Sequence, residues 1–298
     1  MASLVSRIVL PLVITLRGSK RMFSSTERTL ASVSKLTARP ARFEPPARLS
    51  RTHSVERAEV NGWPVYTIGP RDGVTNRTVF YLHGGCYVFE IDPVHWSFIA
   101  KLATEASVSV VVPIMPLAPR GTASSVVPDV AEMIAARIAA VGIDRVSVVG
   151  DSAGGGMTLA VAMELRDRGL APLHSTVLIS PWLDISGTDP QLAVIAPRDP
   201  WLAVPGTRAA GALYRGDLPE DDWRVSPING SLNGLGAVTM FSGTRDILNA
   251  DAERFAALAA TAGLDLTYLV GDGMLHVYPI LPMPEGDAAR AIVVAAVG

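Results

Sequence analysis

Apolar residues follow two different spacings along the chain, and together these predict a sheet whose strands are joined by helices. Short continuous apolar runs bounded by turn residues are typical of buried strands, and they cover residues 77–82, 107–112, 145–149, 176–180, 237–242 and 265–270. Segments with helical spacing lie between and after them, at residues 94–106, 127–141, 153–168, 251–262 and 285–297. This order predicts an α/β fold with a mostly parallel central sheet and helices on both faces.

Three segments depart from this alternation and indicate the domain organisation. Residues 55–68 alternate around Asn61-Gly62, a strong hairpin signal. Two amphipathic helical segments, the second near residues 26–36, precede this hairpin and end in a proline-rich stretch. Residues after Ile185 fit neither spacing. We therefore expect N-terminal cap helices in residues 1–50, a core in two parts at 51–184 and 224–298, and a cap insertion at 185–223.

The composition is that of a globular protein, and it excludes several classes of partner. Of the 298 residues, 49% are hydrophobic and 18% charged, which is unlike a disordered chain. A formal net charge of −2 provides no general attraction to the phosphates of nucleic acids. Cys86 is the single cysteine, so the sequence predicts neither an internal disulfide nor a structural zinc site. We expect no metal ion and no organic cofactor.

The N-terminal apolar run leaves its role open. It extends from Ile8 to Leu16, is interrupted by Pro11, and is shorter than the roughly 18 residues needed to cross a bilayer. Basic residues on both sides are typical of a short signal peptide, but no Ala-x-Ala cleavage site follows closely. We expect a helix of a folded cytoplasmic protein with no stable membrane span. Association with a membrane or the cell surface through this segment remains the alternative.

The segment Gly150-Asp151-Ser152-Ala153-Gly154-Gly155 carries the clearest chemical signal. A predicted strand precedes it and a predicted helix follows, so Ser152 would lie at a sharp strand-to-helix turn that exposes a nucleophilic hydroxyl. The alternative is that Ser152 is only the N-cap of the helix. The context on both sides favours the nucleophile.

A serine nucleophile needs a histidine base and an acid that orients it. Asp246 directly follows the strand at 237–242, and His276 follows the strand at 265–270, which is the order expected in hydrolases with such a sheet. Asp184 and Asp251 are the alternative acids, and Asp251 can also be interpreted as a helix N-cap. We predict Ser152, His276 and Asp246 as the catalytic residues.

His83-Gly84-Gly85 follows the strand at 77–82 and predicts an oxyanion hole. Glycines allow main-chain amides to point at a negatively charged oxygen, so the N–H groups of Gly84, Gly85 and Ala153 are the predicted donors. An ordinary tight turn is the alternative. His83 is expected to shape this turn and not to act as a base.

These motifs resemble the hormone-sensitive-lipase-like group of α/β hydrolases, and within it the small bacterial esterases and acetyl-hydrolases. The resemblance covers most of residues 77–280, through the segments 83–85, 150–155, 180–184, 199–202, 226–228 and 273–276 and the Asp246 loop. It implies cofactor-free hydrolysis of short-chain carboxylic esters through an acyl-serine intermediate, beneath a helical cap. Cys86 replaces a glycine that is usual in this family, and Ile114 to Arg120 lacks the family's usual polar and charged residues.

The predicted substrate is a small-molecule ester with a short, acetyl-like acyl group. Aromatic and apolar residues are the candidates for its pocket, namely Tyr87, Trp182, Trp201, Leu202 and Tyr214. The alternatives are deacetylation of an N- or O-acetylated metabolite, a longer-chain lipase and, with least support, a non-catalytic ligand receptor. A homodimer is possible.

Overall fold

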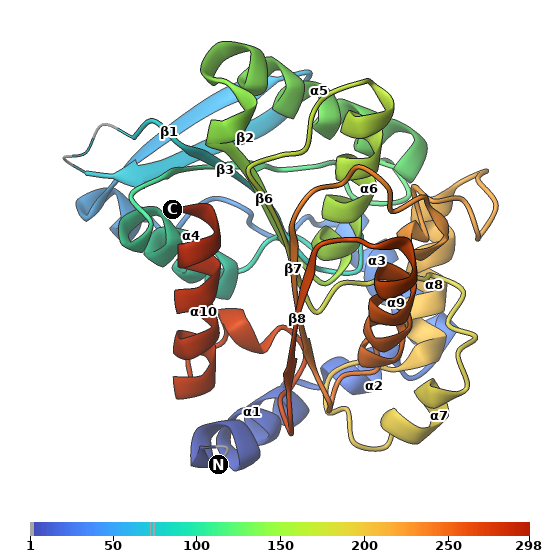
Figure 1. Cartoon of the computed structure of the whole chain (residues 1–298). Helices are drawn as coiled ribbons and strands as arrows, with labels where there is room; N and C mark the ends of the chain where they lie inside the picture. The colour runs from blue at the N-terminus through green and yellow to red at the C-terminus, as the bar shows by residue number, and fades with distance from the viewer. Residues whose placement is uncertain (1–2, 72, 74) are drawn as a thin grey trace.

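An eight-stranded sheet forms the centre of the protein in a computed structural model that describes residues 3–71, 73 and 75–298 (Figure 1). Met1 and Ala2 of the predicted N-terminal cap segment lie outside the described residues. The strands lie in the order β1-β2-β4-β3-β5-β6-β7-β8. Their bounds are β1 (His53–Val60), β2 (Trp63–Pro70), β3 (Thr78–Leu82), β4 (Ser109–Pro113), β5 (Val146–Asp151), β6 (Ser175–Ile179), β7 (Val238–Gly243) and β8 (Leu266–Gly271).

Most of this sheet is parallel. β2 pairs antiparallel with β1 and β4, and every other pair is parallel. The β1–β2 hairpin turns at Asn61 and Gly62, which both have positive φ, as the sequence predicts for this pair. The predicted α/β-hydrolase fold is confirmed.

Helices cover both faces of the sheet (Figure 1). α4 (Pro93–Glu105) and α10 (Pro284–Val297) pack on one face, and α5 (Ala123–Val141), α6 (Ala153–Asp167) and α9 (Asn249–Ala262) on the other. β3, β5 and β6 contain only buried residues, because both of their faces are covered. Because these strands are parallel, their carboxyl ends lie at the same edge of the sheet, where ligand-binding crevices form in such folds.

Some elements differ in detail from the sequence expectation. α5 begins at Ala123 and not at the predicted Val127, because Thr122 and Ser125 form a capping box that starts the helix earlier. The segment 185–223 contains two helices, α7 (Gln191–Ile195) and α8 (Val204–Arg215), within irregular chain. Short 3₁₀ helices lie at Ala47–Arg51, Ile143–Arg145, Pro227–Asn229 and Tyr278–Ile280.

The N-terminal segment folds as a series of helices that contact this insertion. A π-helical turn (Val5–Val9) leads into α1 (Leu10–Arg17), α2 (Ser19–Phe23) and α3 (Thr26–Ala38). α2 and α3 both pack on α8. The Lys20 ammonium donates to the Ala196 carbonyl oxygen at 2.6 Å and to that of Asp199. The two parts predicted as a cap thus lie against each other, although they are about 150 residues apart in the chain.

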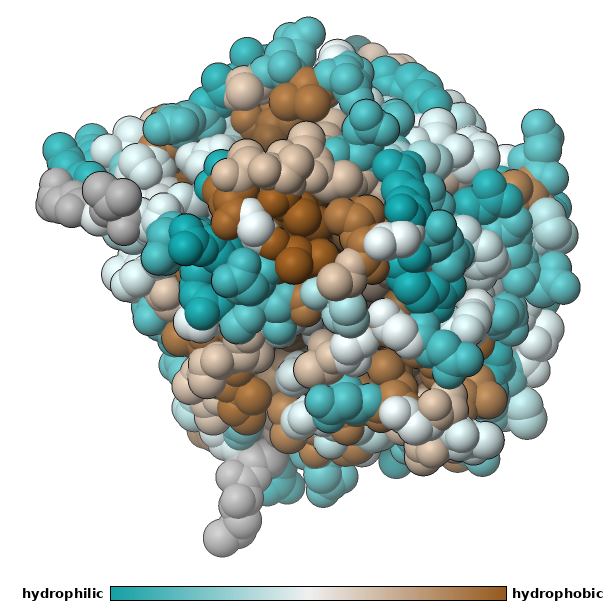
Figure 2. All heavy atoms as spheres, turned by 45° about the horizontal axis from the view of Figure 1, so that its top comes forward, coloured by the Kyte–Doolittle hydropathy of each residue, from teal (hydrophilic) through white to brown (hydrophobic). Residues whose placement is uncertain are grey.

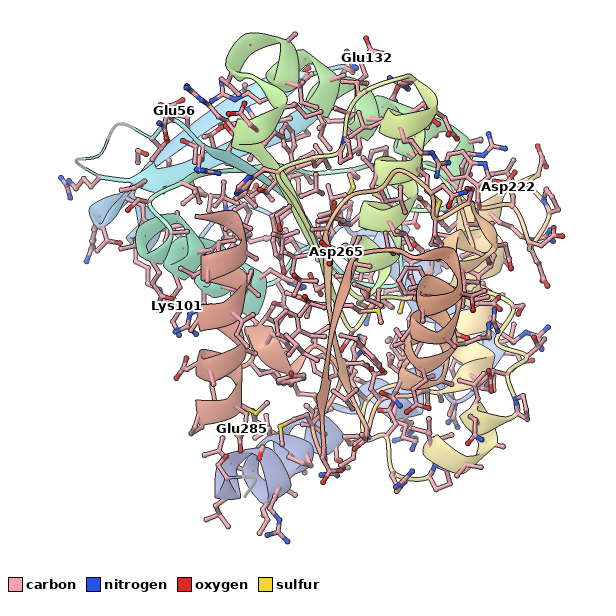
Figure 3. All side chains as sticks on the ribbon, in the orientation of Figure 1. Glu56, Lys101, Glu132, Asp222, Asp265 and Glu285 are labelled. Carbon is pink, nitrogen blue, oxygen red and sulfur yellow. The ribbon has the colours of Figure 1, made fainter. Side chains whose placement is uncertain are left out.

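Hydrogen bonds to α10 hold the start of the N-terminal segment. The Oγ atoms of Ser3 and Ser6 donate to the Glu285 carboxylate at 2.9 and 3.1 Å. Figure 3 shows Glu285 at the end of α10 that faces α1. Across the described residues, no helix has both the length and the apolar character needed to cross a bilayer.

Gly206 allows the close approach between α8 and the N-terminal segment. A Cβ at this position would lie 2.4 Å from Phe23 Cα, closer than real contacts allow. We expect Gly206→Val to lower the free energy of unfolding by about 1–3 kcal/mol, because backbone on both sides must move. Urea denaturation measures this loss.

Ala212→Val is the matched control, since Ala212 is exposed on the same helix. It should cost no more than about 0.7 kcal/mol, the difference in helix propensity. Equal losses in the two variants would show that the contact at Gly206 is not the source of the effect.

Candidate active site

Ser152 lies at the sharp turn between β5 and α6. Its backbone has φ 54° and ψ −121°, a region that residues other than glycine rarely adopt. The turn depends on glycines: a Cβ at Gly150 would lie 2.3 Å from the Gly154 carbonyl oxygen, and one at Gly154 would lie 2.0 Å from that of Leu82. This geometry places the Ser152 hydroxyl at the carboxyl end of the sheet.

His276 and Asp246 approach Ser152 from the ends of two later strands. Asp246 lies in the loop between β7 and α9, and His276 lies in the loop after β8. His276 Nε2 is 2.9 Å from Ser152 Oγ, and His276 Nδ1 is 2.7 Å from Asp246 Oδ2. All three side chains are buried. The structure therefore brings the three predicted catalytic residues into one hydrogen-bonded chain.

The Asp246 carboxylate raises the pKa of His276. Burial disfavours the imidazolium, but attraction to Asp246 outweighs it, so the pKa of His276 is raised above its usual value of about 6.5. Asp199 and Asp151 act in the same direction. A base must be unprotonated to accept a proton, so His276 loses this capacity as the pH falls through that raised value.

Asp199 joins the insertion to the loop that contains Asp246, which the sequence pattern did not predict. Its Oδ1 accepts from the amides of Trp201 and Leu202 at 2.7 and 3.0 Å, and its Oδ2 accepts from the Ile247 amide at 2.9 Å. Burial, with repulsion from Asp246, raises the pKa of Asp199 to about 6. The motif at 199–202 is visible in the sequence, but not the distant amide that Asp199 binds.

The two alternative acids lie away from His276 in a separate cluster. Asp184 Oδ2 accepts from Arg254 Nη2 at 2.9 Å, and Asp251 Oδ1 lies 3.5 Å from Arg254 Nη1. Asp251 is not the N-cap of α9: it lies within the first helical turn, and Leu248 holds the cap position. Burial, with repulsion from Asp184, raises the pKa of Asp251 to about 7. Neither carboxylate orients the imidazole.

The glycine turn after β3 offers main-chain amides to the site, with one correction to the prediction. The Gly84 N–H donates to Asp151 Oδ1 at 3.0 Å, so it is not available to an oxyanion. In the part of the chain that the structure describes, the amides of Gly85, Cys86 and Ala153 make no hydrogen bond. These three become the candidate donors, and Cys86 takes the place predicted for Gly84.

Cys86 stands where a glycine would fit more easily. Its φ is 52°, a left-handed backbone conformation that glycine adopts without strain but that is unfavourable for a residue with a side chain. Burial raises the pKa of its thiol to about 12, which keeps the sulfur protonated. His83 shapes the same turn: its Nδ1 lies 2.6 Å from the Gly84 carbonyl oxygen, and burial lowers its pKa to about 4.

A cavity of about 310 Å³ opens at Ser152 and His276. Of the five predicted pocket residues, Trp201 and Leu202 line it. Much of its apolar wall was not identified from the sequence: most of these residues lie in the first 25, which no motif relates to the edge of the sheet, and Phe89 follows the glycine turn. That part of the wall comprises Leu10, Val13, Ile14, Met22, Phe23 and Phe89.

The other three predicted pocket residues lie outside this cavity. Tyr87 stacks on Tyr214 with ring centroids 3.5 Å apart, and it stacks on Trp182 at 5.6 Å. All three rings are buried in the core between the insertion and α6. They pack as an aromatic cluster and do not form a binding surface. Over residues 3–71, 73 and 75–298, no His, Cys, Asp or Glu cluster is arranged to hold a metal ion.

Comparisons with known proteins agree with this geometry. The model of the alpha/beta hydrolase fold family matches residues 79–280. A Mycobacterium tuberculosis protein provisionally named acetyl-hydrolase LipR is 30% identical over 280 residues, which cover 93% of this chain and 89% of that protein. A triacylglycerol lipase of the same bacterium is 33% identical over 229 residues, 76% of this chain but 48% of the lipase, so this chain spans about half of its length.

A solved structure extends the similarity over the whole chain. The crystal structure of an esterase from the bacterial hormone-sensitive lipase (HSL) family aligns with a TM-score of 0.83 and 27% identity, over 100% of both chains. The chain therefore belongs to the α/β-hydrolase family, and within it to the hydrolases that resemble hormone-sensitive lipase.

Proposed function

We propose that this protein hydrolyses short-chain carboxylic esters through an acyl intermediate on Ser152. The observation that carries the proposal is the unbroken hydrogen-bonded chain from Asp246 through His276 to Ser152 Oγ. A serine, an imidazole and a carboxylate in this order are the parts that acyl transfer requires. The esterase and acetyl-hydrolase names of the relatives support the same reaction class.

The proposed reaction has two halves. Ser152 Oγ attacks the ester carbonyl carbon while His276 Nε2 takes its proton, and the amides of Gly85, Cys86 and Ala153 bind the oxygen that becomes negative. The C–O bond to the alcohol then breaks, and the proton passes from His276 to the departing alcohol. In the second half a water molecule attacks the acyl-serine by the same route and releases the acid.

The first test removes the nucleophile. Ser152→Ala should lower kcat for an aryl acetate by about 10⁵-fold or more, because the acyl-serine can no longer form. A fluorophosphonate probe should label the wild-type protein and not this variant, as read by intact-protein mass spectrometry. Unchanged turnover in a folded Ser152→Ala protein would contradict the mechanism, and so would labelling at another residue.

The size of the cavity supports a short acyl group. A space of about 310 Å³ is at the small end of ligand pockets, and it must hold part of the alcohol as well as the acyl group. Leu202 and Phe23 form part of an apolar wall that suits a short saturated acyl group. This favours an esterase or acetyl-hydrolase over a longer-chain lipase. Deacetylation of an N- or O-acetylated metabolite uses the same groups and remains the second candidate.

We predict that p-nitrophenyl acetate and butyrate give higher kcat/KM than octanoate and longer esters. Leu202→Ala should shift the optimum toward longer acyl groups, since it removes part of the wall, by up to about tenfold per pair of methylenes. Leu192→Ala is the matched control: it removes a buried leucine of the insertion that does not line the cavity. A wild-type rate that rises steadily with acyl length would overturn the assignment.

We also infer that the N-terminal segment binds reversibly to an anionic lipid surface. Leu4, Ile8, Leu12 and Leu16 recur at helical spacing and are all exposed, with Leu16 at 77%. Arg7, Arg17 and Arg21 lie in the same segment, and no acidic residue occurs from Ser3 to Thr26. An apolar stripe with basic neighbours is typical of helices that lie in a membrane interface.

Cosedimentation tests this surface. Vesicles that contain phosphatidylglycerol should retain the protein more than pure phosphatidylcholine vesicles, and less at high salt. Leu12→Asp with Leu16→Asp should abolish retention without altering hydrolysis of a soluble ester, because neither residue lines the cavity. Val194→Asp with Leu258→Asp, at exposed apolar residues elsewhere, is the control. Absence of vesicle binding, with a dimer in light scattering that the first pair dissociates, would instead assign the stripe to the predicted homodimer.

A further inference from the structure

Glu90 is a half-buried carboxylate in the wall of the cavity at Ser152, and the proposed reaction does not use it. It lies in the loop between the glycine turn and α4 and lines the same cavity as Ser152 and His276. Its Oε2 is shielded from solvent, yet no donor reaches this atom among the residues that the structure describes. A buried carboxylate oxygen without a donor costs free energy, so such atoms are rare in folded proteins.

Arg120 is a nearby cation, but it leaves the Glu90 carboxylate without an ion pair. Arg120 is exposed and attracts Glu90, yet nowhere in the described chain do the two approach closely enough to form an ion pair. Burial raises the pKa of Glu90, and the attraction to Arg120 offsets this rise only in part. Repulsion from Glu44 adds to the rise. The protein itself therefore does not compensate the charge of Glu90.

Negative charge prevails on the wall of this cavity. Of its lining residues in the described chain, Glu90, Asp92 and Asp151 carry carboxylates, and Arg17 carries a guanidinium. His95 adds no positive charge, because its Nδ1 accepts from the Asp92 amide at 3.1 Å and its Nε2 faces Asp151. Charge of one sign in a cavity with apolar walls raises the local concentration of ligands of the opposite sign.

Glu90 differs from the other two acids, which already have donors. Asp92 caps α4 by accepting from two of its amides, at 2.7 and 3.4 Å. Asp151 accepts from the Tyr81 hydroxyl at 2.7 Å and from the Gly84 amide at 3.0 Å. With no such partner in the described structure, Glu90 is the carboxylate of this wall that is available to a ligand.

We propose that Glu90 is a specificity-determining residue that binds an ammonium group in the alcohol portion of the substrate. The inference rests on the proposed function, in which Ser152 accepts a short, acetyl-like acyl group. Because an acetyl-like group carries no ammonium of its own, the positive group belongs to the alcohol. The substrates are then short-chain esters of amino alcohols, and esters of anionic alcohols are repelled.

Two esters of equal shape test this assignment. 2-(Dimethylamino)ethyl acetate is protonated near neutral pH, and 3-methylbutyl acetate replaces its N–H⁺ by a neutral C–H. The ratio of their kcat/KM values is compared between variants, which cancels the different intrinsic reactivity of the esters and any general change in activity. We expect Glu90→Gln to lower the ratio of cationic to neutral ester by about tenfold or more, because a contact with a charged group is lost.

Two further variants separate the charge of Glu90 from other effects. Glu90→Asp keeps the carboxylate and should retain most of the preference for the cationic ester. Glu56→Gln is the matched control: it makes the same change of charge at an exposed residue of β1 that does not line the cavity. It should leave the ratio within about twofold, since solvent screens a distant exposed charge. An unchanged ratio in Glu90→Gln, or an equal fall in Glu56→Gln, would overturn the proposal.

Stability distinguishes ligand binding from a structural role. Glu90→Gln removes an uncompensated buried charge, so its midpoint of urea denaturation should equal or exceed that of the wild-type protein. A carboxylate kept for the fold, for example through Arg120, would instead lower the midpoint when it is replaced. A lower midpoint together with an unchanged ratio would assign Glu90 to the fold and refute the ammonium site.

Binding without turnover keeps this inference separate from the proposed reaction. Ser152→Ala cannot form the acyl-serine, so calorimetric titration of this variant measures binding of the same two esters. The dimethylamino ester should bind more tightly, and adding Glu90→Gln should remove this preference. That result, with a wild-type protein that hydrolyses neither ester, would mean that the proposed function has failed while the ammonium site stands. Hydrolysis of both esters without any preference in the titration would mean the reverse.

Discussion

Close approach of three chain segments at glycine residues is the constraint on which the whole site depends. The turn before α6 exists only because Gly150 and Gly154 let backbone lie where a Cβ would overlap carbonyl oxygens of the turn and of β3. Gly84 meets the same region from the other side, since a Cβ there would lie 2.3 Å from Asp151 Oδ2. The strained backbone of Ser152 is held by these contacts, and the hydroxyl, the amides and the buried carboxylate take their positions from them.

Three buried carboxylates surround His276, and each has its own hydrogen-bond partners. Asp246, Asp199 and Asp151 are all buried, and the negative charge of each raises the pKa of His276. Asp246 is bound directly by the His276 imidazole, and Asp199 accepts from three main-chain amides. Asp151 accepts from the Tyr81 hydroxyl and the Gly84 amide, and its Oδ2 lies 3.3 Å from His95 Nε2. Because each acid has a separate partner, the base remains able to exchange its proton while the surrounding negative charge is accommodated.

The sheet and the three polar groups at its edge could be predicted from the sequence, because both depend on short, contiguous segments. Strands such as Thr78–Leu82 are mainly apolar runs between turn residues, and Ser152, Asp246 and His276 each lie in the segment that follows a strand. The predictions that were wrong concern residues whose surroundings depend on distant contacts. The Gly84 amide is taken by a carboxylate 67 positions later, and Tyr87 stacks on Tyr214. No periodicity reports such pairings.

The cap shows the same limit in another form. Helical spacing indicated helices in the first 50 residues, but it could not indicate which of their faces meets the catalytic edge. That information lies in contacts such as Gly206 against Phe23 and Ser6 against Glu285, between residues that are far apart in the chain. Apolar residues also lie on the face seen in Figure 2, so exposure alone does not single out a functional surface. The N-terminal stripe that we propose to bind lipid combines exposed apolar residues with basic neighbours and lies near the cavity.

The division of labour between α1 and the sheet has an evolutionary consequence. Side chains from the first 25 residues form part of the cavity wall, whereas the proposed catalytic groups come from residues after 80. Substitutions in this leading segment can therefore change the cavity without altering Ser152, His276 or Asp246. Related proteins that differ mainly in this segment are therefore expected to differ in substrate preference before they differ in reaction.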